Sequence, residues 1–202
     1  MIKVYGSPKS STGRVYWMME ELGLKYERMP MDMRAKEHKS EKFLKVNPNG
    51  KVPALDDNGY VIWESMAINT YLADKYKSPL AGKTPEERGH IQQWSYWSML
   101  ELQKHLIEVF IQKVFVPEDR RDQGVIEKGM TASLPLFAIL DNHLASNKYL
   151  VGDSFTLADL NVCSVANIAA AIQMDISNFK NVQRWIGLCK DRPAFQKYAT
   201  IE

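Results

Sequence analysis

The stretch of sequence that decides the fold is Asn47-Pro48-Asn49-Gly50-Lys51-Val52-Pro53-Ala54-Leu55. An Asn-Pro-Asn-Gly turn leads directly into a short apolar strand. A second run of strand-forming residues, Tyr60-Val61-Ile62-Trp63, follows the polar turn Asp56-Asp57-Asn58-Gly59. That run ends at Glu64-Ser65, a pair typical of the start of a helix. Turn, strand, turn, strand and helix therefore follow one another without intervening segments.

This order of elements can hold a short extended peptide. The backbone groups of Val52 can pair with the backbone of a ligand, as an added strand pairs with a sheet edge. The helix start offers free amides and the hydroxyl of Ser65 to a carboxylate, while Glu64 can receive an ammonium group. The arrangement suits an amino-acid head group that carries both charges. Each fragment alone is a common turn or cap signal, so the specificity lies in their spacing.

The composition is that of a globular protein. The chain has 202 residues, 45% of them hydrophobic and 25% charged, which fits one or two compact domains. The net charge is +2, with 26 basic and 24 acidic residues dispersed along the chain, so we predict no nucleic-acid partner. No apolar run approaches the ~18 residues of a membrane span, and the amino terminus lacks the apolar core of a signal peptide. We therefore expect a cytoplasmic protein that does not bind a membrane.

The two cysteines, Cys163 and Cys189, lie in apolar helical contexts. Neither belongs to a CxxC motif or to a Cys/His spacing that holds a metal. We predict buried thiols in a reducing compartment, and no metal cofactor.

Local patterns divide the chain into two domains. Residues 1–77 alternate short strand patterns with helical patterns, which predicts a small α/β domain. Residues 78–84 have the composition of a linker, and residues 85–202 show only helical patterns, which predicts an all-helical bundle. We expect its helices at about 85–115, 119–146, 156–173, 179–190 and 193–199. Within it, Thr156 and Asp159 have the spacing of a capping box, which we interpret as structural.

The chain resembles the glutathione transferase superfamily over essentially its whole length. The resemblance rests on the Gly50–Leu55 strand, the Glu64-Ser65 pair, the Phe155–Asp159 capping motif and the order of an α/β domain before an all-α domain. It implies a thioredoxin-like amino-terminal domain, and glutathione as cosubstrate.

The resemblance also implies roles for individual residues. The Val52–Pro53 bond should be cis, which would turn the Val52 backbone toward the cysteinyl part of glutathione. Glu64 and Ser65 would hold the γ-glutamyl end.

The segment Ala35–Leu44 looks most like the phi-type and related bacterial serine-class transferases. In those enzymes a His-Lys pair meets the glycyl carboxylate, so we assign this role to His38 and Lys39, with Lys51 contacting the same tripeptide. The alternative for His38-Lys39 is a solvated polar loop. Met66 stands where phi-like members often have Arg, so their polar subunit-interface network need not form in this chain.

A hydroxyl in the loop after the first strand is expected to stabilise the glutathione thiolate. By resemblance to serine-type classes the leading candidate is Ser10, four residues before Arg14 and four after Gly6. Ser11 is a close rival, because either hydroxyl of the doubled serine could take this role while the other caps the first helix. Tyr5, at the end of the strand, ranks third. The loop has no Cys, which argues against cysteine-type thiol transferases.

The predicted function is that of a homodimeric glutathione S-transferase that conjugates the thiolate to small hydrophobic electrophiles. The electrophile pocket is expected beside the first long helix of the bundle. One alternative is a glutathione-dependent isomerase, dehalogenase, etherase or peroxidase on the same scaffold. The other is a non-catalytic binding or assembly module, for which a degraded glutathione site would be expected. Helical residues considered for the electrophile pocket are Trp94, Trp97, Met99, Leu102, His105, Leu106, Phe110 and Phe115.

Overall fold

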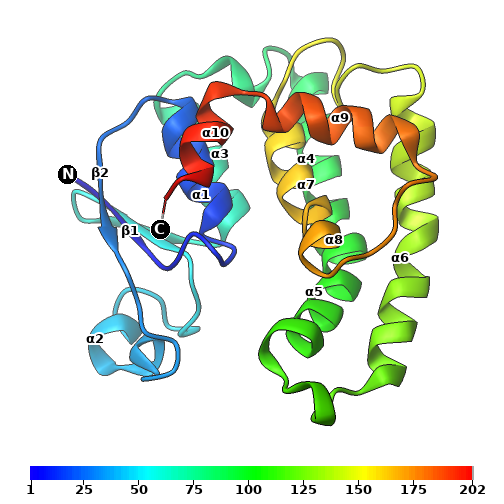
Figure 1. Ribbon diagram of the computed structural model, residues 1–202. Coiled ribbons are helices and arrows are strands. Elements are labelled where there is room, and N and C mark those ends of the chain that lie inside the picture. The colour runs from blue at the N-terminus through cyan, green and yellow to red at the C-terminus, as the bar shows by residue number, and fades with distance from the viewer. Residues whose placement is uncertain (202) are drawn as a thin grey trace. The chain divides into compact units, whose positions relative to one another are not determined.

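The computed structural model describes residues 1–201 and divides into two compact units. Unit 1 contains residues 1–81 together with the carboxy-terminal segment from Asp191 onward, and unit 2 contains residues 82–190. Unit 1 has a four-stranded sheet with helices, and unit 2 is helical (Figure 1). The predicted α/β domain followed by an all-α domain is confirmed.

The sheet of unit 1 has the strand order β2-β1-β3-β4. Its strands are β1 Ile2–Tyr5, β2 Tyr26–Met29, β3 Ala54–Asp57 and β4 Tyr60–Trp63. β1 runs parallel to β2, whereas the pairs β1–β3 and β3–β4 are antiparallel.

The turn between β3 and β4 is shorter than the sequence predicted. The strand begins at Ala54 and includes Asp56 and Asp57, so only Asn58 and Gly59 form the turn. Both have positive φ angles, +53° and +96°. A two-residue turn with two positive φ angles matches the twist of a hairpin, which explains why the ladder extends through both aspartates.

The pairing register aligns one end of all four strands. Met29 pairs with Tyr5, Tyr5 with Ala54, and Ala54 with Trp63. The carboxyl ends of β1, β2 and β4 and the amino end of β3 therefore meet along one edge of unit 1. The segments that follow or precede these four residues are brought to the same place.

Helices cover the sheet because their apolar residues face it. α1 Gly13–Glu21 buries nearly all of its length, with Val15, Trp17 and Met18 completely inaccessible. α3 Ser65–Lys75 buries Ile68 and Leu72. A short helix, α2 Glu41–Leu44, follows the 3₁₀ turn Glu37–Lys39 (η1), and a second 3₁₀ turn, Pro79–Ala81 (η2), closes the segment after α3.

The last helix, α10 Pro193–Ala199, belongs to unit 1, whereas the sequence predicted residues 85–202 as one helical domain. Phe195 meets the ring of Trp17 edge-on at a centroid distance of 4.9 Å. Arg192 donates two hydrogen bonds to the Glu21 carboxylate, at 2.7 and 2.6 Å. These contacts with α1 explain the difference from the prediction, since they depend on residues about 170 positions apart in sequence.

Unit 2 follows the predicted helical pattern closely. The helix expected at 85–115 stays helical throughout but widens twice into π-helical stretches, Ser98–Gln103 (η3) and Ile111–Phe115 (η4). Cys163 and Cys189 are buried, as predicted. Among residues 1–201 no helix combines the length and apolarity needed to cross a bilayer. The remaining elements are α4 Pro85–Trp97, α5 Lys104–Phe110, η5 Glu118–Arg120, α6 Gln123–Leu144, α7 Leu157–Ala166, α8 Ile168–Ala171 and α9 Lys180–Lys190.

The predicted capping box at the start of α7 is present. Asp159 Oδ2 accepts hydrogen bonds from the amide and the hydroxyl of Thr156, at 2.9 and 3.1 Å. Its other oxygen accepts from the Leu150 amide at 2.9 Å and from Trp185 Nε1 at 2.8 Å. Burial raises the pKa of this carboxyl, and the hydrogen bonds oppose that rise. Asp159 thus links the preceding loop, α7 and α9.

Replacing Asp159 by Ala is expected to lower the free energy of unfolding by about 3 kcal/mol, because four buried donors lose their acceptor. Urea unfolding monitored by Trp fluorescence measures this change. Asp153→Ala is the matched control, since Asp153 is exposed on the preceding loop. An Asp159→Ala variant as stable as the control would contradict the structural role.

Asp57 should make the stability of unit 1 sensitive to acid. Burial opposes ionisation of its carboxyl, but hydrogen bonds from Lys75, Tyr71 and Asn58 outweigh it and hold the pKa below its usual value. A lowered pKa stabilises the folded state above the unfolded-state pKa of about 4, and this contribution is lost as the pH falls through the folded-state pKa. Asp57→Asn should therefore flatten the acid limb of a stability–pH curve, whereas the exposed control Asp74→Asn should not.

Candidate active site

The aligned end of the sheet collects every segment that carries a predicted site residue. Tyr5 leads into the loop with the doubled serine, and Met29 leads toward the His38-Lys39 turn. Ala54 follows Pro53, and Trp63 precedes Glu64. Sheet register therefore places these segments at one edge of unit 1, although they are spread over 60 residues of sequence.

The hydroxyl of Ser10 forms hydrogen bonds within its own loop. It donates to the Ser7 carbonyl oxygen at 2.7 Å and lies 2.9 Å from Thr12 Oγ1. It also accepts a hydrogen bond from the Thr12 amide at 3.2 Å. With one proton to donate, this hydroxyl is used to close the turn before α1.

The hydroxyl of Ser11, unlike that of Ser10, takes no part in the hydrogen bonds of the loop. Ser11 is half-buried, and its side chain makes no hydrogen bond to any other part of residues 1–201. The helix begins after Thr12, the N-cap residue, whose side chain makes no capping hydrogen bond. Ser11 therefore does not cap the helix, and its donor remains available next to the amides at the start of α1.

Arg14 lies in the first turn of α1, close to the candidate site. The sequence indicated no role for it beyond its spacing from Ser10. Its side chain is buried, and burial lowers the pKa of the guanidinium to about 10, an effect opposed by nearby Tyr198 and Glu64. A group with that pKa remains cationic at neutral pH. The signal in the sequence is an arginine next to the apolar stripe of a helix that is buried almost throughout.

The His38-Lys39 turn packs against the Asn47–Gly50 turn that precedes Val52. Lys39 Nζ donates to the Asn49 carbonyl oxygen at 3.2 Å. Gly50 has a φ of +56°, and a Cβ at this position would lie 2.8 Å from both the His38 carbonyl oxygen and Lys39 Nζ. The ring atom Nδ1 of His38 is buried and has no hydrogen-bond partner within residues 1–201. The structure thus joins two of the predicted binding segments.

Asn47 organises the turn before Val52. Its buried side chain donates to the Lys51 carbonyl oxygen at 2.6 Å and accepts from the Asn49 amide at 3.0 Å. The following Val52–Pro53 bond is cis, as expected. The side chain of Lys51 is exposed and makes no hydrogen bond or ion pair within residues 1–201.

Val52 presents an unpaired backbone at the edge of unit 1. It precedes the first ladder residue, Ala54, and neither its amide nor its carbonyl is hydrogen-bonded within residues 1–201. Gly6 lies close by, at the start of the serine loop, which consists of residues 6–12 between β1 and α1. A Cβ on Gly6 would be 3.0 Å from Val52 Cβ and would overlap Thr12 Oγ1. Free backbone groups at this position can pair with an extended peptide beside the serine loop.

Glu64 and Ser65 form the start of α3 in an unusual backbone conformation. Glu64 has φ +71° and ψ +112°, a region that non-glycine residues rarely occupy and that is concentrated at functional sites. Its side chain is exposed, whereas Ser65 is buried as the first helical residue. The pair therefore presents a carboxylate next to the free amides of a helix start.

Two family models cover most of the chain. Residues 1–74 match the model of the glutathione S-transferase amino-terminal domain, and residues 103–193 match that of its carboxy-terminal domain. The chain belongs to the glutathione S-transferase family.

Individual members of the family resemble this transferase over their full lengths. Glutathione S-transferase 3 of Zea mays is 32% identical, over 97% of this chain and 92% of the relative. Glutathione S-transferase GstB of Escherichia coli K12 is 31% identical, over 100% and 99%. The glutathione-bound theta-class enzyme of Xanthomonas axonopodis pv. citri has a similar structure, with a TM-score of 0.90, 31% identity and coverage of 100% and 98%. These relatives support transferase activity for this chain.

The helical residues considered for electrophile binding fall into three sets in unit 2: buried, exposed and half-buried. The half-buried residues are Trp97, Met99, His105 and Phe110. Trp94, Leu102 and Leu106 are buried, and Trp94 packs edge-on against Trp97. Phe115 is 71% exposed at the end of the second π-helical stretch. The first set belongs to the core of the bundle, as such stripes usually do. No group of three or more His, Cys, Asp or Glu in the described chain is arranged to hold a metal ion.

Gly50→Ala should separate the two binding turns. The added methyl group would meet the His38 carbonyl oxygen and would impose a positive φ on alanine, so we expect unfolding to become easier by about 1–2 kcal/mol. Affinity for glutathione, measured by calorimetry, should also fall. Gly23→Ala is the control, because Gly23 has a similar φ of +61° but open space around it. Equal effects of both variants on binding would contradict the packing argument.

Proposed function

We propose that this transferase binds glutathione along the aligned end of the sheet in unit 1. The observation that carries the proposal is the unpaired backbone of Val52 beside Gly6. An extended tripeptide paired with Val52 would bring its cysteinyl side chain to the loop that carries Ser11.

The two ends of glutathione then meet groups of suitable charge. Glu64 accepts hydrogen bonds from the ammonium group of the γ-glutamyl residue, and Ser65 with the amides of α3 receives its carboxylate. The glycyl carboxylate meets His38, Lys39 and Lys51. Lys39 has two ammonium protons left after its bond to Asn49, and Lys51 has three.

Within the serine loop, the structure favours Ser11 over Ser10 as the donor to the thiolate. Both are candidates from the sequence, and the resemblance to serine-type classes alone places Ser10 first. The Ser10 proton already has acceptors within the loop, at 2.7 and 2.9 Å. The Ser11 hydroxyl can donate to a ligand without breaking an existing hydrogen bond, which costs less free energy.

The proposed chemistry requires the thiolate form of glutathione. A free thiol has a pKa of about 8.5, so a lower pKa increases the fraction of nucleophile at neutral pH. Three features act in this direction: the Ser11 hydroxyl, the amides at the start of α1 and the buried cation of Arg14. The thiol proton leaves to solvent, and the sulfur lone pair forms a bond to an electrophilic carbon. In a substitution the leaving group departs with its bonding electrons; in an addition the π bond of the electrophile breaks, its electrons move to the neighbouring atom, and a proton from solvent neutralises the charge. Ser11 acts as a hydrogen-bond donor and not as a covalent nucleophile.

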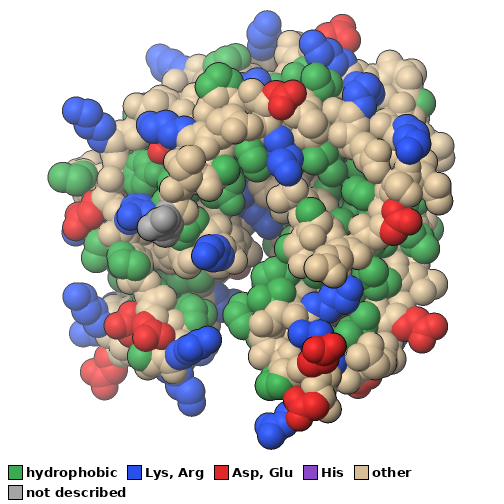
Figure 2. Space-filling view, in the orientation of Figure 1, with side chains coloured by type: hydrophobic (Ala, Val, Ile, Leu, Met, Phe, Trp, Pro, Cys, Tyr) green, Lys and Arg blue, Asp and Glu red, His purple; other side chains and the backbone are tan. Residues whose placement is uncertain are grey.

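The wider biological role follows the family. We propose small hydrophobic electrophiles as cosubstrates, a role in detoxification, and a cytoplasmic location. Figure 2 shows acidic and basic side chains interspersed over the visible face, in keeping with a partner that is not a nucleic acid. A homodimer is supported by exposed apolar side chains on β4 and after α3, namely Tyr60, Val61, Trp63 and Tyr76.

The absorbance of enzyme-bound glutathione thiolate, followed against pH, tests the assignment. In the wild type the thiolate should titrate well below the free thiol. Ser11→Ala should raise the pKa of the bound thiol and lower kcat by about 10- to 100-fold at neutral pH, since the thiolate loses its donor. Ser10→Ala should have the smaller effect, through loosening of the loop.

A loss of thiolate confined to Ser10→Ala would reverse the assignment within the loop. Absence of glutathione binding in the wild type would contradict the proposed site and favour a non-catalytic module. Product analysis with a panel of electrophiles separates conjugation from isomerisation, dehalogenation, ether cleavage or peroxide reduction on the same scaffold.

A further inference from the structure

The carboxy-terminal helix α10 reaches the serine loop through the side chain of Tyr198. The Tyr198 hydroxyl donates to the Pro8 carbonyl oxygen at 3.5 Å. The same hydroxyl lies against Gly13, the first residue of α1: a Cβ on Gly13 would be 2.5 Å from the Tyr198 oxygen and 2.5 Å from the Pro8 carbonyl oxygen. Tyr198 therefore contacts both ends of the turn that contains Ser11.

The contact requires glycine at position 13. Any side chain there would collide at once with the phenol and with the loop backbone, so Pro8, Gly13 and Tyr198 are packed as closely as their atoms allow. Gly13 also donates its amide to the Ser10 carbonyl oxygen at 2.9 Å, which closes the turn. A displacement of the phenol would therefore be transmitted directly to the backbone on either side of Ser11.

Tyr198 is held in place by a set of contacts along α10. Phe195 packs edge-on against both Trp17 and Tyr198, at centroid distances of 4.9 and 5.6 Å. Arg192 pairs with Glu21 at the start of the helix. Figure 1 shows α10 beside α1 within unit 1. The phenol is thus fixed to α1 by neighbours on its own helix.

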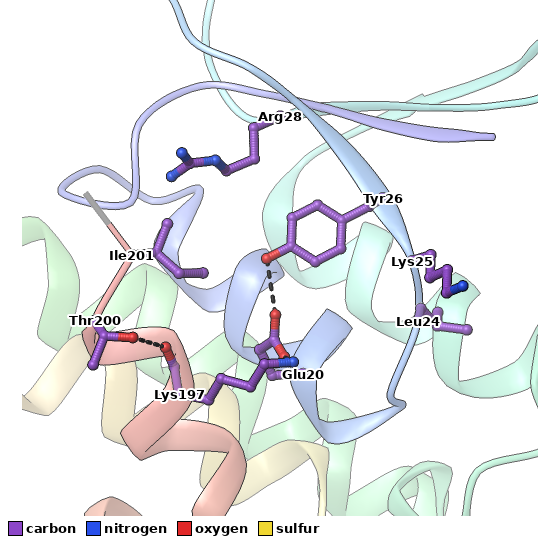
Figure 3. A pocket seen from close by; sticks show the side chains of 8 residues that line it. All are labelled: Glu20, Leu24, Lys25, Tyr26, Arg28, Lys197, Thr200 and Ile201. Carbon is purple, nitrogen blue, oxygen red and sulfur yellow. Dashed lines mark hydrogen bonds and ion pairs between the residues drawn. The ribbon is translucent and has the colours of Figure 1, made fainter.

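The far side of α10 borders an open groove of about 780 Å³ (Figure 3). There Glu20 receives a hydrogen bond from the Tyr26 hydroxyl at 2.9 Å and an ion pair from Lys197 at 2.5 Å. Figure 3 shows Glu20 between these two side chains, which come from different elements. On this side Glu20, Tyr26 and Lys197 make no hydrogen bond or ion pair with residues 7–12 in the described part of the chain, so they offer matched controls.

We propose that Tyr198 is a positioning residue for the thiolate donor in the serine loop. Resting on the function proposed above, the inference is that the phenol fixes the loop through Pro8 and Gly13 so that the Ser11 hydroxyl is oriented toward the sulfur before glutathione binds. A pre-oriented donor stabilises the thiolate without reorganisation, whereas a loop free to move weakens that hydrogen bond. Tyr198 itself does not touch the substrate in this proposal.

Tyr198→Phe tests the proposal, because it removes the hydroxyl and keeps the ring that packs on Phe195. We expect kcat to fall about three- to tenfold while the KM for glutathione changes less than twofold, as for the loss of one neutral hydrogen bond. The pKa of the bound thiol should rise. A purely structural role would reduce the active fraction and leave that pKa unchanged, so the pKa separates the two explanations.

A second variant and two controls complete the experiment. Gly13→Ala pushes the same contact apart from the other side and should also raise the pKa of the bound thiol. Tyr26→Phe makes the same chemical change in the groove, and Lys197→Ala removes the ion pair on the same helix; neither should alter the pKa. Thermal unfolding of all four variants reports their folding.

The outcomes discriminate between this proposal and the function on which it rests. A wild-type enzyme whose bound thiol titrates like free glutathione would overturn both. A lowered pKa in the wild type that persists in the folded Tyr198→Phe variant would overturn only the role of Tyr198. If Tyr198→Phe does not fold, an unchanged pKa in Gly13→Ala would overturn it equally.

Discussion

The row of paired residues Met29, Tyr5, Ala54 and Trp63 is the constraint on which the site depends. Because β2 is parallel to β1 while β3 and β4 alternate in direction, three strands end and one begins at the same edge. A shift of one residue in any pairing would turn the side chains of that strand to the other face and move its loop away from the others. Sheet register thus brings the segments proposed to bind glutathione, which come from distant parts of the sequence, to one location.

At that edge, some side chains hold the turns in place, whereas other groups proposed to meet glutathione make no hydrogen bond within the described chain. Asn47 and Thr12 are buried and use their side chains to hold turns, and Ser10, though exposed, is occupied in the same way. Ser11, the backbone of Val52 and the carboxylate of Glu64 remain open to a ligand. This separation lowers the free-energy cost of binding, since a group that already closes a turn would have to give up that hydrogen bond before it could bind substrate.

The electrostatic character of the site also has its origin in the fold. A guanidinium in water would do little for a thiolate a few ångströms away, because water screens the interaction. Arg14 is instead buried at the start of α1, near Glu64 and Tyr198, where the effective dielectric constant is lower. The cation, the helix amides and a hydroxyl donor are thereby collected around one loop.

The sequence by itself determined the elements and the types of group in the site. Local signals sufficed for a turn between the two hairpin strands, for Thr156 and Asp159 as a capping box, and for the alternation of strands and helices, because their physics acts between residues close in sequence. The turn itself was predicted two residues too long, over Asp56–Gly59 instead of Asn58-Gly59. The family resemblance identified the ligand and the cis bond at Pro53, which is present. Only the tertiary structure decided which serine has a free hydroxyl, that Arg14 is buried, and that α10 returns to α1. Those outcomes depend on competition among neighbouring hydrogen bonds and on contacts between Trp17 and Phe195 across the length of the chain, for which no local pattern exists.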